Sequence, residues 1–387
     1  MTRKTRVRSA DLRGVSRLAI DATTGVTDLV EAMHAKVAPR ILGKSAEGRT
    51  RGITGFVYRS VRWVTRLVGG GIDTALLRLA PVLGEGSPST GREGLLAALN
   101  GVLGDHLAAS GNALAIPMRL EPGQAPAGGK LLILAHGLCM NDLQWNRKGH
   151  DHGAALARDL GYTAVYLQYN SGLHISTNGR AFAERIEALV AGWPVPLQEL
   201  VILGHSMGGL VARSALHYGK MAGHQWPRHL GKLVFLGTPH HGAALERGGN
   251  WVDAVLGVNS YTAPLARLGK IRSAGITDLR HGNLRDEDWE GRDRFERAGD
   301  RRQPVSLPEG VECFAMAAVA GGELGSDGLV SQNSALGRHE DPRLDLSIPE
   351  SRQWVVHGIS HFDLLSEPRS YAKIAEWLRP SSAASAA

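Results

Sequence analysis

The sequence predicts an α/β protein with a doubly wound, mostly parallel sheet. Strand-length apolar runs, such as residues 130–135 and 232–236, alternate with segments of helical pattern, such as residues 179–191. A short, continuous aliphatic run is typical of a parallel strand that is buried on both faces. Helices between such strands favour a sheet covered on both sides, whose ligand binds beyond the carboxyl ends of the strands.

The same patterns place the other elements of this region. A helix is expected over residues 93–107, another from the serine turn described below to residue 217, and a closing helix over residues 371–378. The expected strands, taken in order along the chain, are residues 112–120, 130–135, 163–169, 199–203, 232–236, 311–319 and 353–356.

The first 110 residues carry the whole excess of positive charge. They hold 16 Lys and Arg against 9 Asp and Glu, whereas the rest of the chain is balanced at 28 against 28. Residues 10–40 and 72–83 are expected to be helical. In residues 53–68, aliphatic side chains gather on one side of a helix and arginines on the other, so this helix either packs on the protein or lies on a membrane surface. We therefore expect a basic helical N-terminal extension over residues 1–110.

No stretch of the sequence has the features of a secretory signal or a membrane span. Asp11, Arg13 and Arg17 interrupt the apolar core that a signal peptide needs, and no run of 18 apolar residues occurs. Two cysteines, Cys139 and Cys313, are too few for a disulfide framework. The expected location is the cytoplasm, with peripheral contact to a membrane through the basic helices as the alternative, and no nucleic acid is expected as a partner.

The most informative stretch is residues 200–213, with the sequence LVILGHSMGGLVAR. An apolar run ends at Gly204, Ser206 stands between glycines, and a helical pattern follows. This is the strand–turn–helix context of a Gly-x-Ser-x-Gly nucleophile elbow. A β-carbon at Gly204 or Gly208 would collide with the neighbouring strand or helix. The stretch therefore predicts Ser206 as a nucleophile.

Four further stretches accompany the serine motif in a consistent order. They are His136-Gly137-Leu138, residues 237–242 (GTPHHG), residues 326–330 (SDGLV) and His361-Phe362-Asp363. Together with the serine motif, they resemble the α/β-hydrolase superfamily of the lipase and esterase kind, including bacterial triacylglycerol lipases and GPI inositol-deacylase-like hydrolases. The resemblance spans about residues 112–380. It implies an α/β-hydrolase fold for a catalytic domain over residues 111–387, with a cap or lid insertion over residues 243–310.

The resemblance also implies a catalytic triad. A serine hydroxyl needs a base to take its proton, and that base needs an orienting acid. In α/β-hydrolases the chain order is serine, acid, histidine, which corresponds here to Ser206, Asp327 and His361. His361 is favoured because the residues around it resemble the histidine loop of bacterial lipases. His357 remains the alternative base and Glu323 the alternative acid.

Two backbone N–H groups are expected to form the oxyanion hole. One belongs to Met207, the residue after the nucleophile, and the other to Leu138, in the loop after the strand over residues 130–135. The adjacent histidines His240 and His241 are expected to have a structural or pocket-lining role. Neighbouring residues on a loop rarely bind one metal ion together, so no metal is assigned to them.

No cofactor is required for this chemistry. Asp363 stands where calcium-dependent bacterial lipases place one ligand, so calcium stays open as an alternative, with Asp293 and Asp300 as candidate partners. Within the insertion, apolar residues at helical spacing predict either a lid over an acyl-chain pocket or a surface insertion that packs on its own domain. Residues 280–302 are rich in charges of both signs and are expected to form a solvated loop.

The expected function is hydrolysis of carboxylic esters, with lipid or other acyl esters as substrates, through an acyl-enzyme on Ser206. Two alternatives stay open, because a fold does not fix a function. An acyltransferase would pass the same acyl group to an alcohol instead of water. A non-catalytic, membrane-peripheral binding protein would use the basic helices and an inactive pocket.

Overall fold

The computed structural model describes most of the chain from residue 90 onward. The described residues are Gly14, Arg17, 90–243, 272–293, 296, 299–321 and 326–379. The chain divides into two compact units, of which the first comprises Met1–Ser89 and Leu107–Ala115, and the second comprises Thr90–His106 and Ile116–Ala387. The sheet and the candidate site belong to the second unit.

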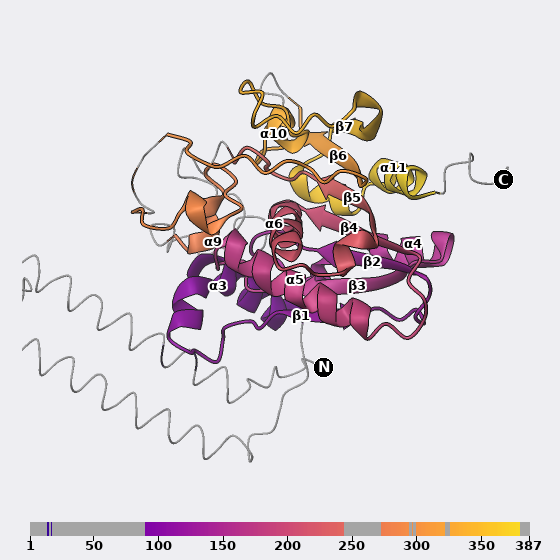
Figure 1. The fold of residues 1–387 in the computed structure, drawn as a ribbon, viewed down its shortest axis with the longest axis horizontal. Coiled ribbons are helices and arrows are strands. Elements are labelled where there is room, and N and C mark those ends of the chain that lie inside the picture. The colour runs from indigo at the N-terminus through magenta and orange to yellow at the C-terminus, as the bar shows by residue number, and fades with distance from the viewer. Residues whose placement is uncertain are drawn as a thin grey trace, which may run out of the picture. The chain divides into compact units, whose positions relative to one another are not determined.

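The second unit contains a seven-stranded sheet with the order β1-β3-β2-β4-β5-β6-β7 (Figure 1). The first strand pairs antiparallel with the third, and all other pairs are parallel. This confirms the doubly wound, mostly parallel sheet of an α/β-hydrolase fold. The strands are β1 (Arg119–Pro122), β2 (Lys130–Ala135), β3 (Thr163–Gln168), β4 (Glu199–His205), β5 (Leu230–Leu236), β6 (Glu312–Val319) and β7 (Gln353–His357).

Helices connect the strands. The α-helices are α3 (Thr90–Ala109), α4 (His152–Leu160), α5 (Ile175–Ala191), α6 (Met207–Met221), α9 (Ala274–Asp278), α10 (Gln332–Ala335) and α11 (Pro368–Leu378). The 3₁₀ helices are η1 (Asp142–Trp145), η2 (Trp226–Arg228), η4 (Asp286–Asp288), η5 (Glu350–Arg352) and η6 (His361–Leu365). Among the helices that the structure describes, none is both long and apolar enough to cross a membrane.

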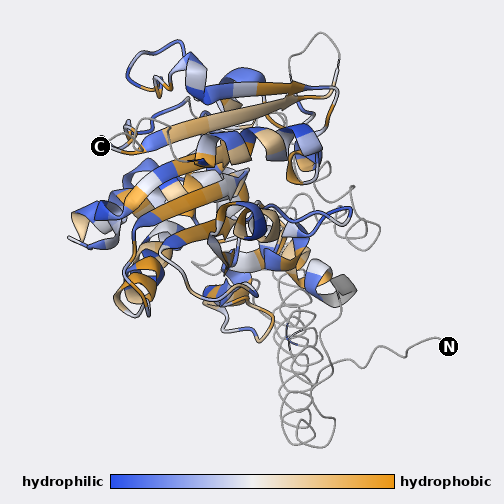
Figure 2. Cartoon of the chain, turned by 90° about the vertical axis from the view of Figure 1, so that its right-hand side faces the viewer, coloured by the Kyte–Doolittle hydropathy of each residue, from blue (hydrophilic) through white to orange (hydrophobic). Residues whose placement is uncertain are grey.

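The core lies on both faces of the sheet, because successive residues of a strand point to opposite sides. Leu132 and Val201 lie in one buried cluster with Leu156 of α4 and Ile374 of α11. Helices α5 and α6 pack side by side (Figure 1) and α6 contacts β4. The strands of the sheet are mostly apolar, whereas the helices carry a mixture of apolar and polar residues (Figure 2). This sandwich fixes the strand ends that hold the candidate site.

One expectation for an individual element is wrong, and one helix was not expected. The first strand covers only Arg119–Pro122 and not residues 112–118, where the Asn112 side chain accepts a hydrogen bond from Leu114 N and forms a turn instead. Helix α4 is absent from the sequence-based list. Its N-cap, Asp151, accepts from Ala154 N, and it ends at Gly161 in the left-handed region, so both capping signals are present in the sequence.

The other strands and helices of this unit lie where they are expected, with shifts of a few residues at their ends. The expected helices over residues 10–40, 53–68 and 72–83 lie outside the described residues, apart from Gly14 and Arg17. The apolar part of the expected lid, residues 244–271, also lies outside them.

Candidate active site

Ser206 occupies a sharp turn between β4 and α6. Its backbone angles, φ 53° and ψ −126°, lie in a region that side-chain-bearing residues rarely adopt. The two glycines flanking the turn allow it, because a Cβ at Gly208 would lie 2.1 Å from the Ala135 carbonyl oxygen and one at Gly204 would lie 2.6 Å from Gly209 Cα. The Ser206 N–H donates to Leu236 O at 2.8 Å, which fixes the turn at the end of β5. The expected elbow geometry is therefore present.

Asp327 and His361 are brought together from two separate loops. Asp327 follows β6, His361 is the first residue of η6 after β7, and the distance from His361 Nδ1 to Asp327 Oδ2 is 2.5 Å. The other carboxylate oxygen, Oδ1, accepts from the N–H groups of Leu329 (2.9 Å) and Val330 (2.7 Å). Asp327 is 3% exposed and His361 is 2% exposed. The turn thus aims one carboxylate oxygen at the imidazole and holds the other in place.

Ser206 and His361 both contact the end of β5. Gly237 directly follows Leu236, the acceptor for the Ser206 N–H, and a Cβ at Gly237 would lie 2.9 Å from Cε1 of His361. The imidazole therefore packs on the peptide that also anchors the serine turn. Since Nδ1 faces Asp327, the opposite ring nitrogen, Nε2, is the one available for proton exchange with a serine.

The structure tests the alternative base, His357, but not the alternative acid, Glu323. His357 is the last residue of β7, and it is exposed and pairs with Val319 in the sheet. The structure gives it no contact with Asp327, so among the described histidines His361 holds the position next to the acid. Glu323 lies outside the described residues.

The loop after β2 lies beside the nucleophile. A Cβ at Gly137 would be 3.0 Å from the Ser206 Cβ, so Leu138, the next residue, lies close to the elbow. The loop is held by the Cys139 N–H, which donates to Ser171 Oγ at 3.0 Å. Met207 is the first residue of α6, and its N–H is among the four that a helix leaves without an intrahelical acceptor. The two residues expected to supply the oxyanion donors therefore belong to segments next to Ser206.

His205 is a neighbour of the site that sequence reasoning missed. Its ring centroid lies 4.8 Å from that of His361, and its Nε2 lies 3.3 Å from the His361 carbonyl oxygen, which can only accept a hydrogen bond. Burial keeps the pKa of His205 well below its usual value, so the ring is neutral and Nε2 carries the donated proton. The available signal was its position directly before the nucleophile. His205 is the last residue of β4 and pairs with Leu236 of β5, which places it at the strand ends that hold the site.

His240 and His241 lie beside two arginines. Arg213 Nη1 donates to His240 Nδ1 at 3.2 Å, and Arg302 Nη1 donates to the His240 carbonyl oxygen at 2.8 Å. Burial, followed by the charge of Arg213, holds the pKa of His240 well below its usual value, and burial lowers that of His241 to about 4. Two guanidinium groups beside these rings oppose the binding of a cation, which agrees with a structural role.

The residues considered for calcium do not form a site. Asp363 Oδ1 accepts from Lys148 Nζ at 2.8 Å, and its Oδ2 accepts from Ser360 Oγ at 2.6 Å. Asp300 is engaged by the Arg302 guanidinium. In the described part of the chain, no three His, Cys, Asp or Glu side chains come together as a metal-binding group. The residues present therefore do not fit a calcium ion at Asp363.

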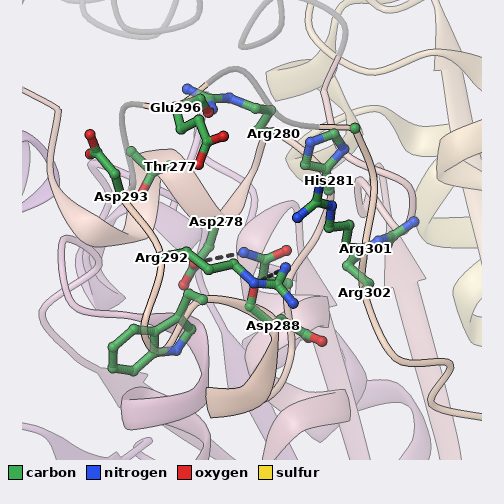
Figure 3. Close-up of a pocket in the computed structure, with 13 residues that line it drawn as sticks. Thr277, Asp278, Arg280, His281, Asp288, Arg292, Asp293, Glu296, Arg301 and Arg302 are labelled. Carbon is green, nitrogen blue, oxygen red and sulfur yellow. Dashed lines mark hydrogen bonds between the residues drawn. The ribbon is translucent and has the colours of Figure 1, made fainter.

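Residues 280–302, which are expected to form a solvated loop, include a buried carboxylate. Asp288 is 4% exposed and accepts from the N–H groups of Leu284, Arg285 and Gln303, so the expectation of a solvated loop is wrong at this position. The segment encloses a small pocket of about 90 Å³ with charges of both signs, where Arg292 extends toward Asp288 (Figure 3). Backbone N–H groups replace water around Asp288, which makes its burial tolerable.

One known family is similar to part of the chain. The family of PGAP1-like alpha/beta domains matches residues 174–301, about a third of the sequence. No curated protein matches the sequence.

Solved structures with a similar fold include lipases and an esterase. The mature form of a lipase from Bacillus licheniformis is 17% identical, with a TM-score of 0.45, over 68% of this chain and 98% of that chain. An esterase from Pyrococcus furiosus is 12% identical, with a TM-score of 0.40, over 68% of this chain and 89% of its own. Lipase B from Aspergillus fumigatus is 15% identical, with a TM-score of 0.40, over 68% of this chain and 56% of its own. Each describes a likeness of fold between distant proteins.

Proposed function

We propose that this protein is a serine hydrolase that cleaves carboxylic esters through an acyl-enzyme on Ser206. The observation that carries the proposal is the convergence at the carboxyl ends of the strands, where the His361–Asp327 pair packs against the peptide that anchors the Ser206 turn. A buried, oriented imidazole beside a strained serine is the arrangement that converts a weak nucleophile into a strong one.

In the first half of the reaction, His361 Nε2 takes the proton of Ser206 as the hydroxyl oxygen attacks the ester carbonyl carbon. The carbonyl oxygen becomes an oxyanion, which accepts hydrogen bonds from the N–H groups of Met207 and Leu138. The C–O bond to the alcohol then breaks, and His361 returns the proton to the leaving alkoxide. Asp327 stays ionised and stabilises the imidazolium that forms in between.

In the second half, water replaces the alcohol. His361 takes one proton from the water as its oxygen attacks the acyl-enzyme, and the same two amides hold the second oxyanion. Collapse of this intermediate returns the proton to Ser206 Oγ and releases a carboxylic acid. Every proton transfer uses side chains of this domain, so the proposed reaction needs no cofactor.

The side chains next to the elbow favour a substrate with an apolar acyl group. Leu138, Met140 and Met207 are each at most 5% exposed, and they lie in the loop after β2 or at the start of α6, where the oxyanion donors are expected. Apolar surroundings exclude water and strengthen the electrostatic stabilisation of an oxyanion. Lipid or other apolar acyl esters are therefore the proposed substrate class.

An active-site label combined with an ester series tests the proposal. The full chain is incubated with a fluorophosphonate probe, and its activity is measured on p-nitrophenyl esters of increasing acyl length. We expect covalent labelling at Ser206, hydrolysis of the esters, and loss of both in Ser206→Ala. Ser347→Ala is the matched control, because Ser347 also has a positive φ (49°) but bonds only to Asp345, away from the site. Labelling that persists in Ser206→Ala, or a folded protein without any esterase activity, would refute the proposal.

A further inference from the structure

A second cavity lies between helix α6 and residues 304–308. Its volume is about 260 Å³, which equals the liquid volume of about nine water molecules. One wall comes from the second half of α6 and the other from residues 304–308. The lining residues are Arg213, Leu216, His217, Lys220, Met221, Pro304, Val305, Ser306, Leu307 and Pro308.

The cavity is separate from the catalytic centre. None of its lining residues belongs to the triad or to the oxyanion loop. Arg213 follows Ser206 by seven residues along α6, which corresponds to about 10 Å at a rise of about 1.5 Å per residue, and Lys220 lies about 20 Å away. A ligand here would therefore not contact the reacting atoms.

Arg213 is a buried cation without a carboxylate partner among the described residues. It is 6% exposed. Its Nη2 donates to Val305 O at 2.6 Å and its Nη1 to His240 Nδ1, while the buried Nε meets no acceptor within the described part of the chain. Neither acceptor is charged. A buried charge that lacks an opposite charge is costly, so a negative group in the adjoining cavity would stabilise this arrangement.

The contrast with Arg302 shows what Arg213 lacks. The Arg302 side chain is 7% exposed, and it forms a salt bridge with Asp300, with an Nη2–Oδ2 distance of 2.8 Å. Both guanidinium groups bind the same residue, His240, one at the ring and one at the carbonyl oxygen. The fold thus supplies a carboxylate to one of two neighbouring buried arginines, and the cavity adjoins the other.

The remaining lining defines the chemistry of the occupant. Lys220 adds a second positive charge at the exposed end of the cavity, and the described lining contains no Asp or Glu. The other side chains are mostly aliphatic or proline, from Leu216 and Met221 on α6 and from residues 304–308. A planar guanidinium fork pairs well with a carboxylate, and an apolar wall accommodates an alkyl chain.

We propose that this cavity binds a small organic anion, specifically an aliphatic carboxylate whose head group contacts Arg213 and whose chain lies against residues 304–308. The site is independent of the proposed esterase reaction, since it needs neither Ser206 nor His361. Binding uses the charge of Arg213 and Lys220 together with burial of the alkyl chain, so the neutral alcohol of equal length binds far more weakly.

Calorimetric titration of the full-length Ser206→Ala protein with hexanoate and with hexan-1-ol tests the site. We expect saturable binding of hexanoate and none of the alcohol. Lys220→Glu should weaken hexanoate binding about fivefold, because it reverses a charge at the mouth of the cavity. Arg228→Glu is the matched control, since Arg228 is equally exposed but lies outside the lining, and it should leave binding unchanged.

The location is tested by photolabelling with a diazirine derivative of hexanoate, followed by peptide mapping. Labels within residues 216–221 and 304–308 support the proposal. Arg213→Lys, which keeps the charge but removes the fork, should weaken binding where the variant folds. Absence of saturable binding, equal binding of acid and alcohol, an unchanged affinity in Lys220→Glu, or labels confined to other segments would each overturn it.

Discussion

His361 Nδ1 lies 2.5 Å from Asp327 Oδ2, and the backbone N–H of His361 also donates to the Asp327 carbonyl oxygen at 3.3 Å. The acid therefore holds both the ring and the main chain of the histidine. This double attachment fixes Nδ1 on the side of the acid, so Nε2 is the ring nitrogen that points away from Asp327. It also makes the pair sensitive to substitutions that preserve shape but change the hydrogen-bonding character of the acid.

Asp327→Asn should lower kcat for ester hydrolysis about 10⁴-fold, because an amide that donates to Nδ1 would leave the wrong tautomer of His361 facing Ser206. Steady-state kinetics on a p-nitrophenyl ester measure the effect, and circular dichroism confirms that the variant is folded. Asp341→Asn is the control, since Asp341 pairs with Arg343 at the surface, and its activity should remain unchanged. Near-normal kcat in Asp327→Asn would contradict the assigned role.

His361→Gln should abolish fluorophosphonate labelling and ester hydrolysis, whereas His357→Gln should retain both. The reason is geometric, because only His361 contacts Asp327 among the described histidines, and His357 is exposed at the end of β7. The two variants are compared by labelling rate at constant pH. Loss of labelling in His357→Gln with normal labelling in His361→Gln would reverse the assignment of the base.

Gly208→Ala should destabilise the protein by at least about 2 kcal/mol, since the new Cβ would lie 2.1 Å from the backbone oxygen of Ala135 and force the elbow or β2 to shift. The free energy of unfolding is measured by urea titration. Gly128→Ala is the control, because its Cβ would meet nothing closer than 3.5 Å. Equal stabilities of the two variants would show that the close approach does not constrain the turn.

Acid should weaken the fold through buried neutral histidines. Burial lowers the pKa of His152 to about 4, and its Nε2–H donates to Leu364 O at 2.9 Å. An unfolded histidine has a pKa near 6.5, so between about pH 6.5 and 4 the unfolded chain binds more protons than the folded one. Stability from His152 is complete above pH 6.5 and is lost as the pH falls toward 4.

At pH 5, protonation linked to His152 should lower the free energy of unfolding by about 2 kcal/mol relative to neutral pH. His152→Gln should show a correspondingly shallower fall in stability between pH 7 and pH 5 in denaturant titrations. His229→Gln, on the loop before β5, is a control that should keep the steep fall. Parallel curves for His152→Gln and the unmodified protein would refute the assignment.

Addition of EDTA should leave ester hydrolysis and the melting temperature unchanged. Lys148 and Ser360 already donate hydrogen bonds to the two carboxylate oxygens of Asp363, and calcium would have to displace both donors. Thermal unfolding with and without chelator, and with added calcium, measures this. A calcium-dependent rise in melting temperature would contradict the expectation.

Much of the fold was predictable because its signals are local. The aliphatic run of β2 and the turn around Ser206 are recognisable within a few residues, and the structure has both. The strand expected over residues 112–118 failed for a local reason too, since Asn112 bonds to its own backbone two residues on. Helix α4 was also predictable locally, from its N-cap Asp151 and from Gly161 at its end.

The candidate site was predictable only in part. Ser206 followed from its own motif, but Asp327 and His361 were chosen by resemblance, and no local pattern excluded His357. His205 was missed because its contacts with His361 join residues that are 156 positions apart in the chain. The burial of Asp288 was missed because a run of charges is expected to stay in water unless backbone N–H groups from other residues surround it.

The sequence by itself determined the alternation of strands and helices and the one turn sharp enough to present a serine, since both depend on residues close together in the chain. Only the tertiary structure decided which histidine contacts Asp327 and which carboxylates are already paired. It also decided which of two buried arginines has no carboxylate partner among the described residues. Those outcomes depend on distances between residues that are 34 to 215 positions apart in the chain. Such distances are set by the packing of helices on the sheet, which no local pattern encodes.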